Sequence, residues 1–459
     1  MPGRSLCTRG RPMKDDPNSH YASLDELRLG MFIHLEGGWL AHPFPLSNFR
    51  LSSPQQIATL RSLKLKRVRW SPAKSDLEFA TGRYEPLPAA EPAQPHGADG
   101  NAGAPAAAAA IEALCDAPEA PELASERVRR LALAQQREAV QHCQRQFAEA
   151  AGACKRMTEL VRSQPEQARE QSEALSRAFV DKMLAHEEVC IRLLGEVAGD
   201  KASTHAINVA VLSLLLGKTF GLPEDEMQDI GVGAVLHDVG KQDVPERLRH
   251  RDDHHSPSEV LAYQEHVTHG VAIARRMGLA EGARRVVEQH HEHADGSGFP
   301  LRIGSDRMTL AARIVALVNR YDNLCNQHVP SRALTPHEAL SLLFAQGKAK
   351  FDGAILGAFV KMMGVYPPGS AVQLTDERYA LVVSVNSSRP LKPRVLVHDP
   401  LVPADEALLL NLESEPHLAI RRSVKPLALP REALDYLSPR PRMAYFFEPL
   451  RETTAETVV

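Results

Sequence analysis

The stretch HHEHADGSGFP, residues 290–300, decides how the middle of the chain is interpreted. It opens with four residues that can hold a metal ion or move a proton: His290, His291, Glu292 and His293. The rest of the stretch is a glycine-rich turn that ends at Phe299 and Pro300. Two neighbouring imidazoles at a helix end add little to packing, so the pair His290–His291 favours a metal-binding loop.

A second motif, HDVGK at residues 237–241, lies upstream. It places His237 beside Asp238, and imidazole and carboxylate groups both ligate divalent Fe, Mn, Ni or Zn, while a carboxylate can also bridge two metals. Lys241 adds a point charge that suits a phosphate. The structural alternative is a helix end, with Gly240 after the last turn and Lys241 compensating for the helix dipole. Alone, this motif does not decide between the two interpretations.

Two single histidines are ambiguous when each is taken alone. His205 lies on the apolar face of a predicted helix, where a hydrogen-bonded core histidine is more common than a metal ligand. His266 lies on a predicted helix whose start has a capping box of Ser256 and Glu259. His269, one turn later, is expected to be structural or exposed.

The metal-site interpretation is stronger for these residues as an ordered set: His205, His237–Asp238, His266 and His290–His291. Each lies on or beside a predicted helix, and facing helices of a bundle commonly build metal sites in their core. If these residues held no metal, each of the four motifs would need its own structural explanation. The joint interpretation as a metal site is therefore favoured. The pair His254–His255 lies in a polar loop and is predicted to be solvated.

Composition narrows the class of protein. With 459 residues, 43% hydrophobic and 24% charged, the chain is expected to be a globular protein of two or three domains. Its net charge of −3 gives no basic field that would point to nucleic acid or an anionic membrane. Scattered cysteines without a CxxC pair, no signal peptide and no sufficiently long apolar segment predict a cytoplasmic protein without membrane insertion.

The predicted fold is mainly α, with smaller mixed and β-rich parts at the two ends. The stretches LRLGMFIHLE, SPQQIATLRSL and KLKRVRW predict a strand, a helix capped by Ser53 and a returning strand. Helical periodicity runs through residues 123–197, with a break at Pro165, and again from 198 to about 364. The expected segments are a disordered start at 1–20, an α/β module at 21–76, an Ala/Pro/Gly linker at 77–122, a helical connector at 123–180, a helical domain at 181–365 and a β-rich tail at 366–459.

The motifs HAINV (205–209), HDVGK, EHVTHG (265–270) and HHEHADGSGFP resemble, in order and spacing, the HD-GYP phosphodiesterases, a branch of the HD metal-phosphohydrolase superfamily. The resemblance covers roughly residues 180–370. The segment 21–76, with WLAHPF, is similar to a small module of unknown function that precedes HD-GYP domains in some bacterial proteins. The resemblance implies an HD-type helical bundle that holds two or three metals and hydrolyses cyclic di-GMP, a bacterial signalling molecule, to pGpG or GMP.

The resemblance also implies residue roles. One metal would be held by His205, His237 and Asp238, and the other by Asp238, His266, His290 and His291. Asp238 would bridge the two metals, with a water or hydroxide between them as nucleophile. Lys241 would neutralise the phosphate, and Gly296 and Gly298 would contact the substrate. The implied cofactors are two divalent ions, with Fe or Mn favoured over Ni or Zn.

Several positions depart from the family pattern. Asn319 stands where the family has a metal-binding aspartate within D-x-x-D-A, so a neutral and poorer ligand is expected there. Asp322 matches the second aspartate of that motif, and its use as a replacement ligand is left open. Phe299 stands where the family has a tyrosine hydroxyl, and HVPSR (328–332) replaces the family's R-P-Y-R. Lys201 replaces a glutamate found in members with three metals, so a third metal is not expected.

Three functions stay open from the sequence. The first is a cyclic di-GMP phosphodiesterase with weakened activity. The second is a degenerate HD-GYP protein that acts as a nucleotide sensor or protein-interaction module without turnover. The third is an HD phosphohydrolase acting on another phosphoester. Further expected partners are a second copy of the chain, through the helical connector, and a signalling protein, through the GFP loop or the N-terminal module.

Overall fold

The computed structural model describes residues 20–35, 48–51, 54–63, 65, 67–75, 121–195, 199–252 and 254–449. The chain separates into two compact units, Met1–Leu131 and Ala132–Val459. The expected disordered start, the Ala/Pro/Gly linker and the Ser53 cap fall outside the described residues, except that residue 20 belongs to a strand and residues 121–122 to a helix. No helix among the described residues is long and apolar enough to cross a membrane.

The first unit contains the predicted small α/β module. Strands β1 (His20–Ser23), β2 (Phe32–His34), β3 (Asn48–Arg50) and β4 (Arg67–Ser71) pair antiparallel in the order β1-β4-β2-β3, accompanied by helix α1 (Pro54–Ser62). Its core buries Leu27, Ile33, Leu35, Leu51, Leu60 and Val68. The strand and helix signals of LRLGMFIHLE, SPQQIATLRSL and KLKRVRW therefore predicted a small α/β module correctly.

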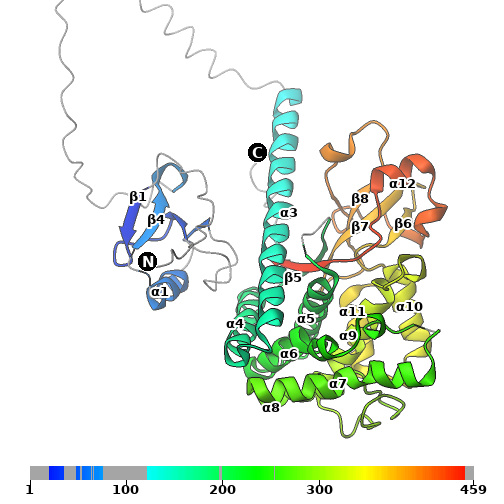
Figure 1. Cartoon of the computed structure of the whole chain (residues 1–459). Helices are drawn as coiled ribbons and strands as arrows, with labels where there is room; N and C mark the ends of the chain where they lie inside the picture. Colours follow the sequence, from blue (N-terminus) through cyan, green and yellow to red (C-terminus); the bar gives the residue numbers. More distant parts are fainter. Residues whose placement is uncertain are drawn as a thin grey trace, which may run out of the picture. The chain divides into compact units, whose positions relative to one another are not determined.

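The second unit is mainly helical, as the sequence predicted. Its central helices are α5 (Lys201–Thr219), α6 (Glu224–Leu236), α7 (Pro257–Met277), α8 (Glu281–Gln289) and α9 (Leu310–Cys325), followed by α10 (Pro336–Gln346) and α11 (Gly353–Met363). In Figure 1, α7 and α8 lie below α5, α6 and α9. Helix α5 is capped by Asp200, whose side chain accepts from the backbone N–H groups of Ala202 and Ser203. Helix α7 begins with the predicted capping box of Ser256 and Glu259.

Two long helices precede this bundle. Helix α3 (Pro121–Leu160) has 40 residues, and α4 (Pro165–Leu184) begins at the proline that was expected to interrupt the helical pattern. Phe147 of α3 and Phe179 of α4 contact the ring of Phe446 edge-on, with ring centroids 6.0 and 6.1 Å away. These helices are therefore anchored against a strand from the far end of the chain.

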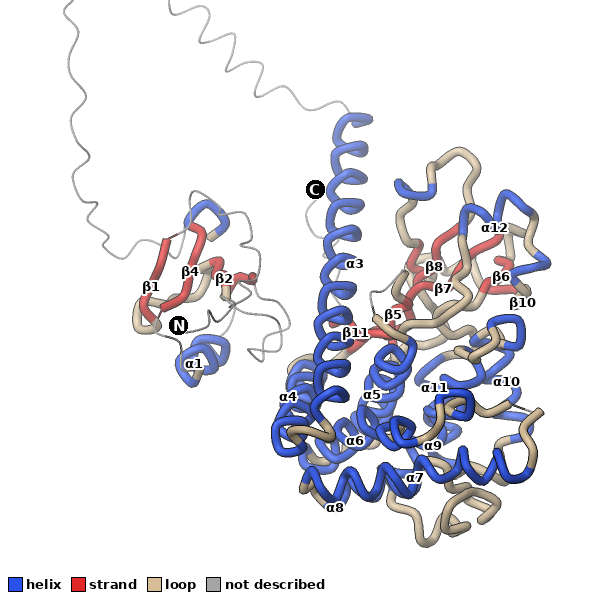
Figure 2. Tube along the Cα trace, viewed as in Figure 1, coloured by secondary structure: helices blue, strands red, loops and turns tan. Residues whose placement is uncertain are grey.

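That strand belongs to the C-terminal sheet. The sheet has seven strands: β5 (Val189–Leu193), β6 (Ala371–Leu374), β7 (Tyr379–Asn386), β8 (Arg394–Val397), β9 (Leu410–Asn411), β10 (Ile420–Ser423) and β11 (Tyr445–Pro449). Its central path is β10-β6-β7-β5-β11, and α12 (Arg431–Leu437) precedes the last strand. Figure 2 shows these strands gathered above the helices.

The expectation of helix throughout residues 123–197 is wrong for β5. Val189–Leu193 is buried along its whole length and pairs antiparallel with β7 and β11. A buried run of this length suits a strand or a helix equally, and only its distant partners decide. The predicted β-rich tail therefore shares one sheet with a segment that lies before the helical bundle.

Candidate metal centre

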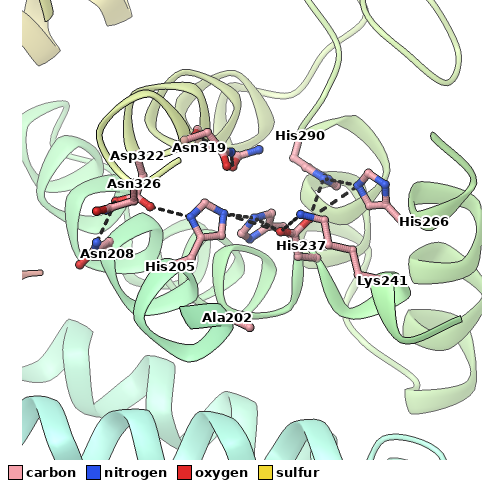
Figure 3. A network of polar contacts seen from close by, with 12 residues as sticks. Ala202, His205, Asn208, His237, Lys241, His266, His290, Asn319, Asp322 and Asn326 are labelled. Carbon is pink, nitrogen blue, oxygen red and sulfur yellow. Dashed lines mark hydrogen bonds and ion pairs between the residues drawn. The ribbon is translucent and has the colours of Figure 1, made fainter. Parts of the chain in front are cut away.

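Six of the predicted ligand residues converge in two groups. One group is His205, His237 and Asp238, and the other is Asp238, His266, His290 and His291. Within each group the ligand atoms all lie within 4.8 Å of one another, and Asp238 belongs to both. Figure 3 shows how His205, His237, His290 and His266 turn their rings toward a common centre.

Three of these histidines are oriented by the same backbone device. His237, His266 and His290 each use Nδ1 to donate to the carbonyl three residues earlier, at 2.7, 2.6 and 2.8 Å. This bond fixes the tautomer with the proton on Nδ1 and leaves the lone pair of Nε2 toward the centre. The three Nε2 atoms accordingly lie 3.4 to 3.8 Å from the nearest carboxylate oxygen of Asp238.

His205 is oriented by a side chain instead. Its Nδ1 lies 2.6 Å from Oδ2 of Asp322, while its Nε2 lies 3.1 Å from Nε2 of His237. The Asp322 carboxylate is fully buried and also accepts from the amides of Asn208 and Asn326, at 2.8 and 2.9 Å. Asp322 therefore lies behind His205 and holds its ring, and it is absent from both ligand groups (Figure 3).

The histidine pocket favours neutral imidazoles. Burial lowers the pKa of His266 to about 4, and it lowers the pKa of His290 and His291 well below the ordinary histidine value, helped by the neighbouring imidazoles. A neutral imidazole keeps the lone pair that a metal needs. At neutral pH these three side chains are therefore ready to bind a cation.

Asp238 stays ionised among them. Burial opposes its ionisation, but Lys241, followed by His237 and His266, outweighs burial and holds the pKa of Asp238 well below its usual range. The ammonium of Lys241 lies 2.6 Å from Oδ2 of Asp238. The centre thus combines one part-buried carboxylate with five imidazoles.

Two buried polar atoms of the centre lack a described hydrogen-bond partner, and this bears on whether these residues fit a metal. Oδ1 of Asp238 and Nε2 of His291 are buried and have no hydrogen-bond partner among the described residues. Leaving such groups without a partner is costly, and native proteins rarely do so without a bound ion or water. The donor set of imidazole nitrogens and a shared carboxylate therefore fits a pair of divalent transition metals.

A close backbone approach brings the two motifs together. The segment Val239–Asp243 forms a 3-10 helix, and its Gly240 packs against the backbone of α7 at His266 and Gly270. A Cβ at Gly240 would overlap the carbonyl oxygen of His266. The glycine in HDVGK is therefore needed because it lets His266 come within reach of Asp238, and not because it ends a helix.

Comparison with known proteins agrees with this geometry. A family model described as HD domain matches residues 157–355, and a model described as a domain of unknown function matches residues 22–172. A cyclic di-GMP phosphodiesterase of Pseudomonas aeruginosa is 27% identical over 81% of this chain and 83% of its own length. The cyclic di-GMP phosphodiesterase response regulator RpfG of Xanthomonas campestris is 29% identical over 32% of this chain and 39% of its own. The chain therefore contains an HD domain and is similar to cyclic di-GMP phosphodiesterases over most of its length.

Other similar proteins include a phosphodiesterase named for a different cyclic dinucleotide and a distantly similar solved structure. A 3'3'-cGAMP-specific phosphodiesterase of Vibrio cholerae is 30% identical over 38% of this chain and 34% of its own. A solved HDG"Y"P protein from Bdellovibrio bacteriovorus covers 74% of this chain and 98% of its own at 13% identity, with a TM-score of 0.39. HD-domain phosphodiesterases are metal-dependent, which agrees with the two ligand groups.

In the loop of residues 290–300, the polar residues divide between those that face the centre and those that bond within the loop. Glu292 is fully buried, and its carboxylate accepts from the backbone N–H groups of Leu301, Arg302 and Ile303. His293 turns to Ser297, with Nδ1 3.0 Å from its hydroxyl. Of the four candidate residues that open the loop, only His290 and His291 therefore join the ligand groups.

The glycines and Phe299 shape this loop. Gly296 has a φ of +73°, and a Cβ at Gly298 would overlap the backbone of residues 291–293. The ring of Phe299 stacks on His291, with centroids 4.5 Å apart. Phe299 thus keeps an aromatic contact with the centre while lacking a hydroxyl. Both glycines line the cleft, and their contact with substrate stays a prediction.

Asn319 occupies a buried position on α9 and is 2% exposed. Its Oδ1 accepts from Nδ2 of Asn323 at 2.6 Å. Asn323 stands where the D-x-x-D-A pattern has alanine, so two neighbouring positions of the motif depart together. Asn319 lines the same cleft as the ligand residues.

Sequence reasoning missed one residue beside the centre, Tyr263 of α7. Its ring is buried, lies 4.9 Å from that of His266 and 6.3 Å from that of Phe299, and has the Lys241 ammonium 5.8 Å from its centroid. The i, i+3 spacing of Tyr263 and His266 on one helix was the available signal.

The three histidines predicted to lie elsewhere do so. His254, His255 and His269 are in neither ligand group. His255 nevertheless lines the wider cleft around the centre, so the prediction that it faces only solvent is too simple.

Proposed function

We propose that this protein is a metal-dependent phosphodiesterase that hydrolyses cyclic di-GMP to pGpG or GMP. The observation that carries the proposal is the pair of ligand groups that share Asp238. The relatives are named as cyclic di-GMP and 3'3'-cGAMP phosphodiesterases, and these names support the substrate class.

The chain's own residues prepare the site for this reaction. Two divalent ions, with Fe or Mn favoured, would polarise the phosphodiester and lower the pKa of a bound water. His266, His290 and His291 present neutral imidazoles because their burial disfavours protonation. Lys241 keeps its proton on Nζ beside Asp238 and can turn this charge toward a phosphate oxygen.

A binding protein without turnover is the second candidate, and Asn319 is the observation that favours it. Its amide is neutral, and its oxygen already accepts from Asn323. An amide oxygen in this position offsets no cationic charge, so the metal near His205 and His237 would be held more weakly than its neighbour. We therefore expect slow turnover. A cytoplasmic location, dimerisation through α3 and α4, and a protein partner at the GFP loop or the N-terminal module remain predictions.

The decisive experiment pairs metal analysis with hydrolysis. Protein purified under reducing, anaerobic conditions with added Fe or Mn should contain metal and convert cyclic di-GMP to a linear product. Asp238→Ala should lose both metals and all activity, because its carboxylate belongs to both groups. His254→Ala is the matched control, since His254 lies outside both groups. Full metal content without hydrolysis would favour the binding protein, and full metal content in Asp238→Ala would refute the shared carboxylate.

A further inference from the structure

The ring of Tyr263, on α7, packs against the ligand residues. Its centroid lies 4.9 Å from that of His266 and 6.2 Å from that of His291. Its backbone carbonyl accepts from Nδ1 of His266 at 2.6 Å, and its ring meets that of Phe299 edge-on, with centroids 6.3 Å apart. Tyr263 therefore belongs to the inner wall of the metal centre.

The same ring lies beside the cation of the centre. The ammonium of Lys241 is 5.8 Å from the ring centroid of Tyr263 and 2.6 Å from Oδ2 of Asp238. Asp238 is the carboxylate that belongs to both ligand groups. A phosphate held at these groups would therefore have Lys241 and Tyr263 as near neighbours.

The hydroxyl is the part of Tyr263 that stays open. Among the residues that the structure describes, this hydroxyl has no hydrogen-bond partner, and yet it is not one of the buried side-chain atoms that lack a partner. Its oxygen therefore keeps accessible surface, although Tyr263 as a whole is only 7% exposed. Tyr263 lines the cleft of about 1830 Å³ that surrounds the metal centre, so this surface faces the cleft.

Packing alone does not account for a tyrosine at this position. A phenylalanine would make the same ring contacts with the two histidines and would bring no polar atom that has to be satisfied. Tyrosine hydroxyls in protein interiors usually find a partner, as those of Tyr321 and Tyr445 do with each other at 3.2 Å. The hydroxyl of Tyr263 is instead available to a ligand in the cleft.

We propose that the hydroxyl of Tyr263 donates a hydrogen bond to a non-bridging oxygen of the phosphodiester that is cleaved at the metal centre. This inference rests on the proposed function. A phenol carries its proton at neutral pH, and a phosphate oxygen is an ionised acceptor, so the bond is charge-assisted. The hydroxyl would hold the phosphate in place beside the charge of Lys241, as a fixed donor that needs no rearrangement during the reaction.

Tyr263→Phe tests the proposal because it removes the hydroxyl and keeps the ring contacts. The manganese-loaded full-length protein is assayed with cyclic di-GMP and with bis-para-nitrophenyl phosphate, which has one phosphodiester and no nucleoside. Calorimetric titration with inorganic phosphate measures the contact without turnover. Metal analysis of each sample shows whether the ligand groups are still filled.

In Tyr263→Phe, kcat/KM should fall about tenfold or more with both substrates, because a charge-assisted hydrogen bond to the phosphate is lost. The Kd for inorganic phosphate should rise severalfold, and the metal content should equal that of the unmodified protein, because the ring remains. Tyr436→Phe is the matched control. This tyrosine lies on α12, away from the described lining of the cleft, so its replacement should change each quantity less than twofold.

Three results in Tyr263→Phe would overturn the assignment. They are an unchanged kcat/KM and phosphate Kd, a loss with cyclic di-GMP alone, which would place the hydroxyl on the nucleoside, and a fall in metal content, which would make Tyr263 a packing residue of the ligand group. Failure of the proposed function would look different. The unmodified protein would then hold metal and hydrolyse neither phosphodiester, while the titration with inorganic phosphate would still show whether the hydroxyl binds that anion.

Discussion

Replacing Asp322 by asparagine should weaken metal binding without touching any residue of the two ligand groups. The Asp322 carboxylate is fully buried and accepts from three side chains, His205, Asn208 and Asn326. An asparagine has one oxygen and one NH2 group in place of two oxygens. If its oxygen stays with the two amides, its NH2 group faces Nδ1 of His205. That nitrogen must then become an acceptor, and the proton moves to Nε2, the atom that faces His237.

The size of the effect follows from this geometry. The bond from His205 to Asp322 is 2.6 Å long and joins an imidazole to a buried carboxylate, so its loss should cost about 1.5–3 kcal/mol. Loss of a residue that orients a metal-binding histidine typically lowers metal affinity by roughly 10- to 100-fold. Expressed as free energy, that is about 1.4–2.7 kcal/mol, which agrees with the estimate from the hydrogen bond.

Calorimetric titration with Mn²⁺ and metal analysis of the purified protein would measure this loss. Asp322→Asn should retain the metal held by His266, His290 and His291 and lose affinity at the group of His205 and His237. Asn326→Ala is the matched control, because it removes a contact to the same carboxylate but leaves His205 bonded. The reasoning is refuted if Asp322→Asn binds both metals as tightly as the unmodified protein, or if the two variants lose affinity equally.

Three further outcomes are expected. Asn319→Asp should raise metal content towards two ions per chain, and the rate of cyclic di-GMP hydrolysis with it, because a carboxylate offsets cationic charge. Metal analysis together with a rate assay measures both. An unchanged metal content would show that the amide of Asn319 is a competent ligand. Lys241→Gln should retain metal but raise the KM for cyclic di-GMP, since it removes the charge beside Asp238; loss of metal would show instead that Lys241 holds the carboxylate in place. In metal-free protein, the free energy of unfolding should fall as pH drops from 6.5 to about 4, because His266 takes up its proton in the unfolded chain first. Urea unfolding in chelator at several pH values measures that slope, and a flat profile would contradict the burial of neutral imidazoles.

The sequence predicted which histidines converge with Asp238, because these residues are encoded locally. His237 and Asp238 are adjacent, and so are His290 and His291. Helical periodicity placed each pair at a helix end, where α6 and α8 do end. Motif order therefore carried most of the information about the centre, and the structure adds the convergence of the helices.

What the sequence could not provide depends on contacts between distant segments. Val189–Leu193 is a strand only because β7 and β11 lie on either side of it. Asp322 was left open as a replacement ligand, and its actual place behind His205 depends on how α9 packs against α5. The pairing of Asn319 with Asn323 is local, by contrast, and the i, i+4 spacing could have revealed it.

The segment before the last strand has a consequence for how the protein is made. The carbonyl of Met443 accepts from the side chains of Asn208 and Asn326, and the N–H of Tyr445 donates to Asn208. These two asparagines in turn hold the carboxylate that orients His205. During translation, helix α5 leaves the ribosome long before residues 443–445 are made. Until then, Asn208 and Asn326 lack these backbone partners, and the carboxylate that orients His205 is held less firmly. A chain released before Met443 would carry every ligand residue and still lack the contacts that set the geometry of one half of the centre.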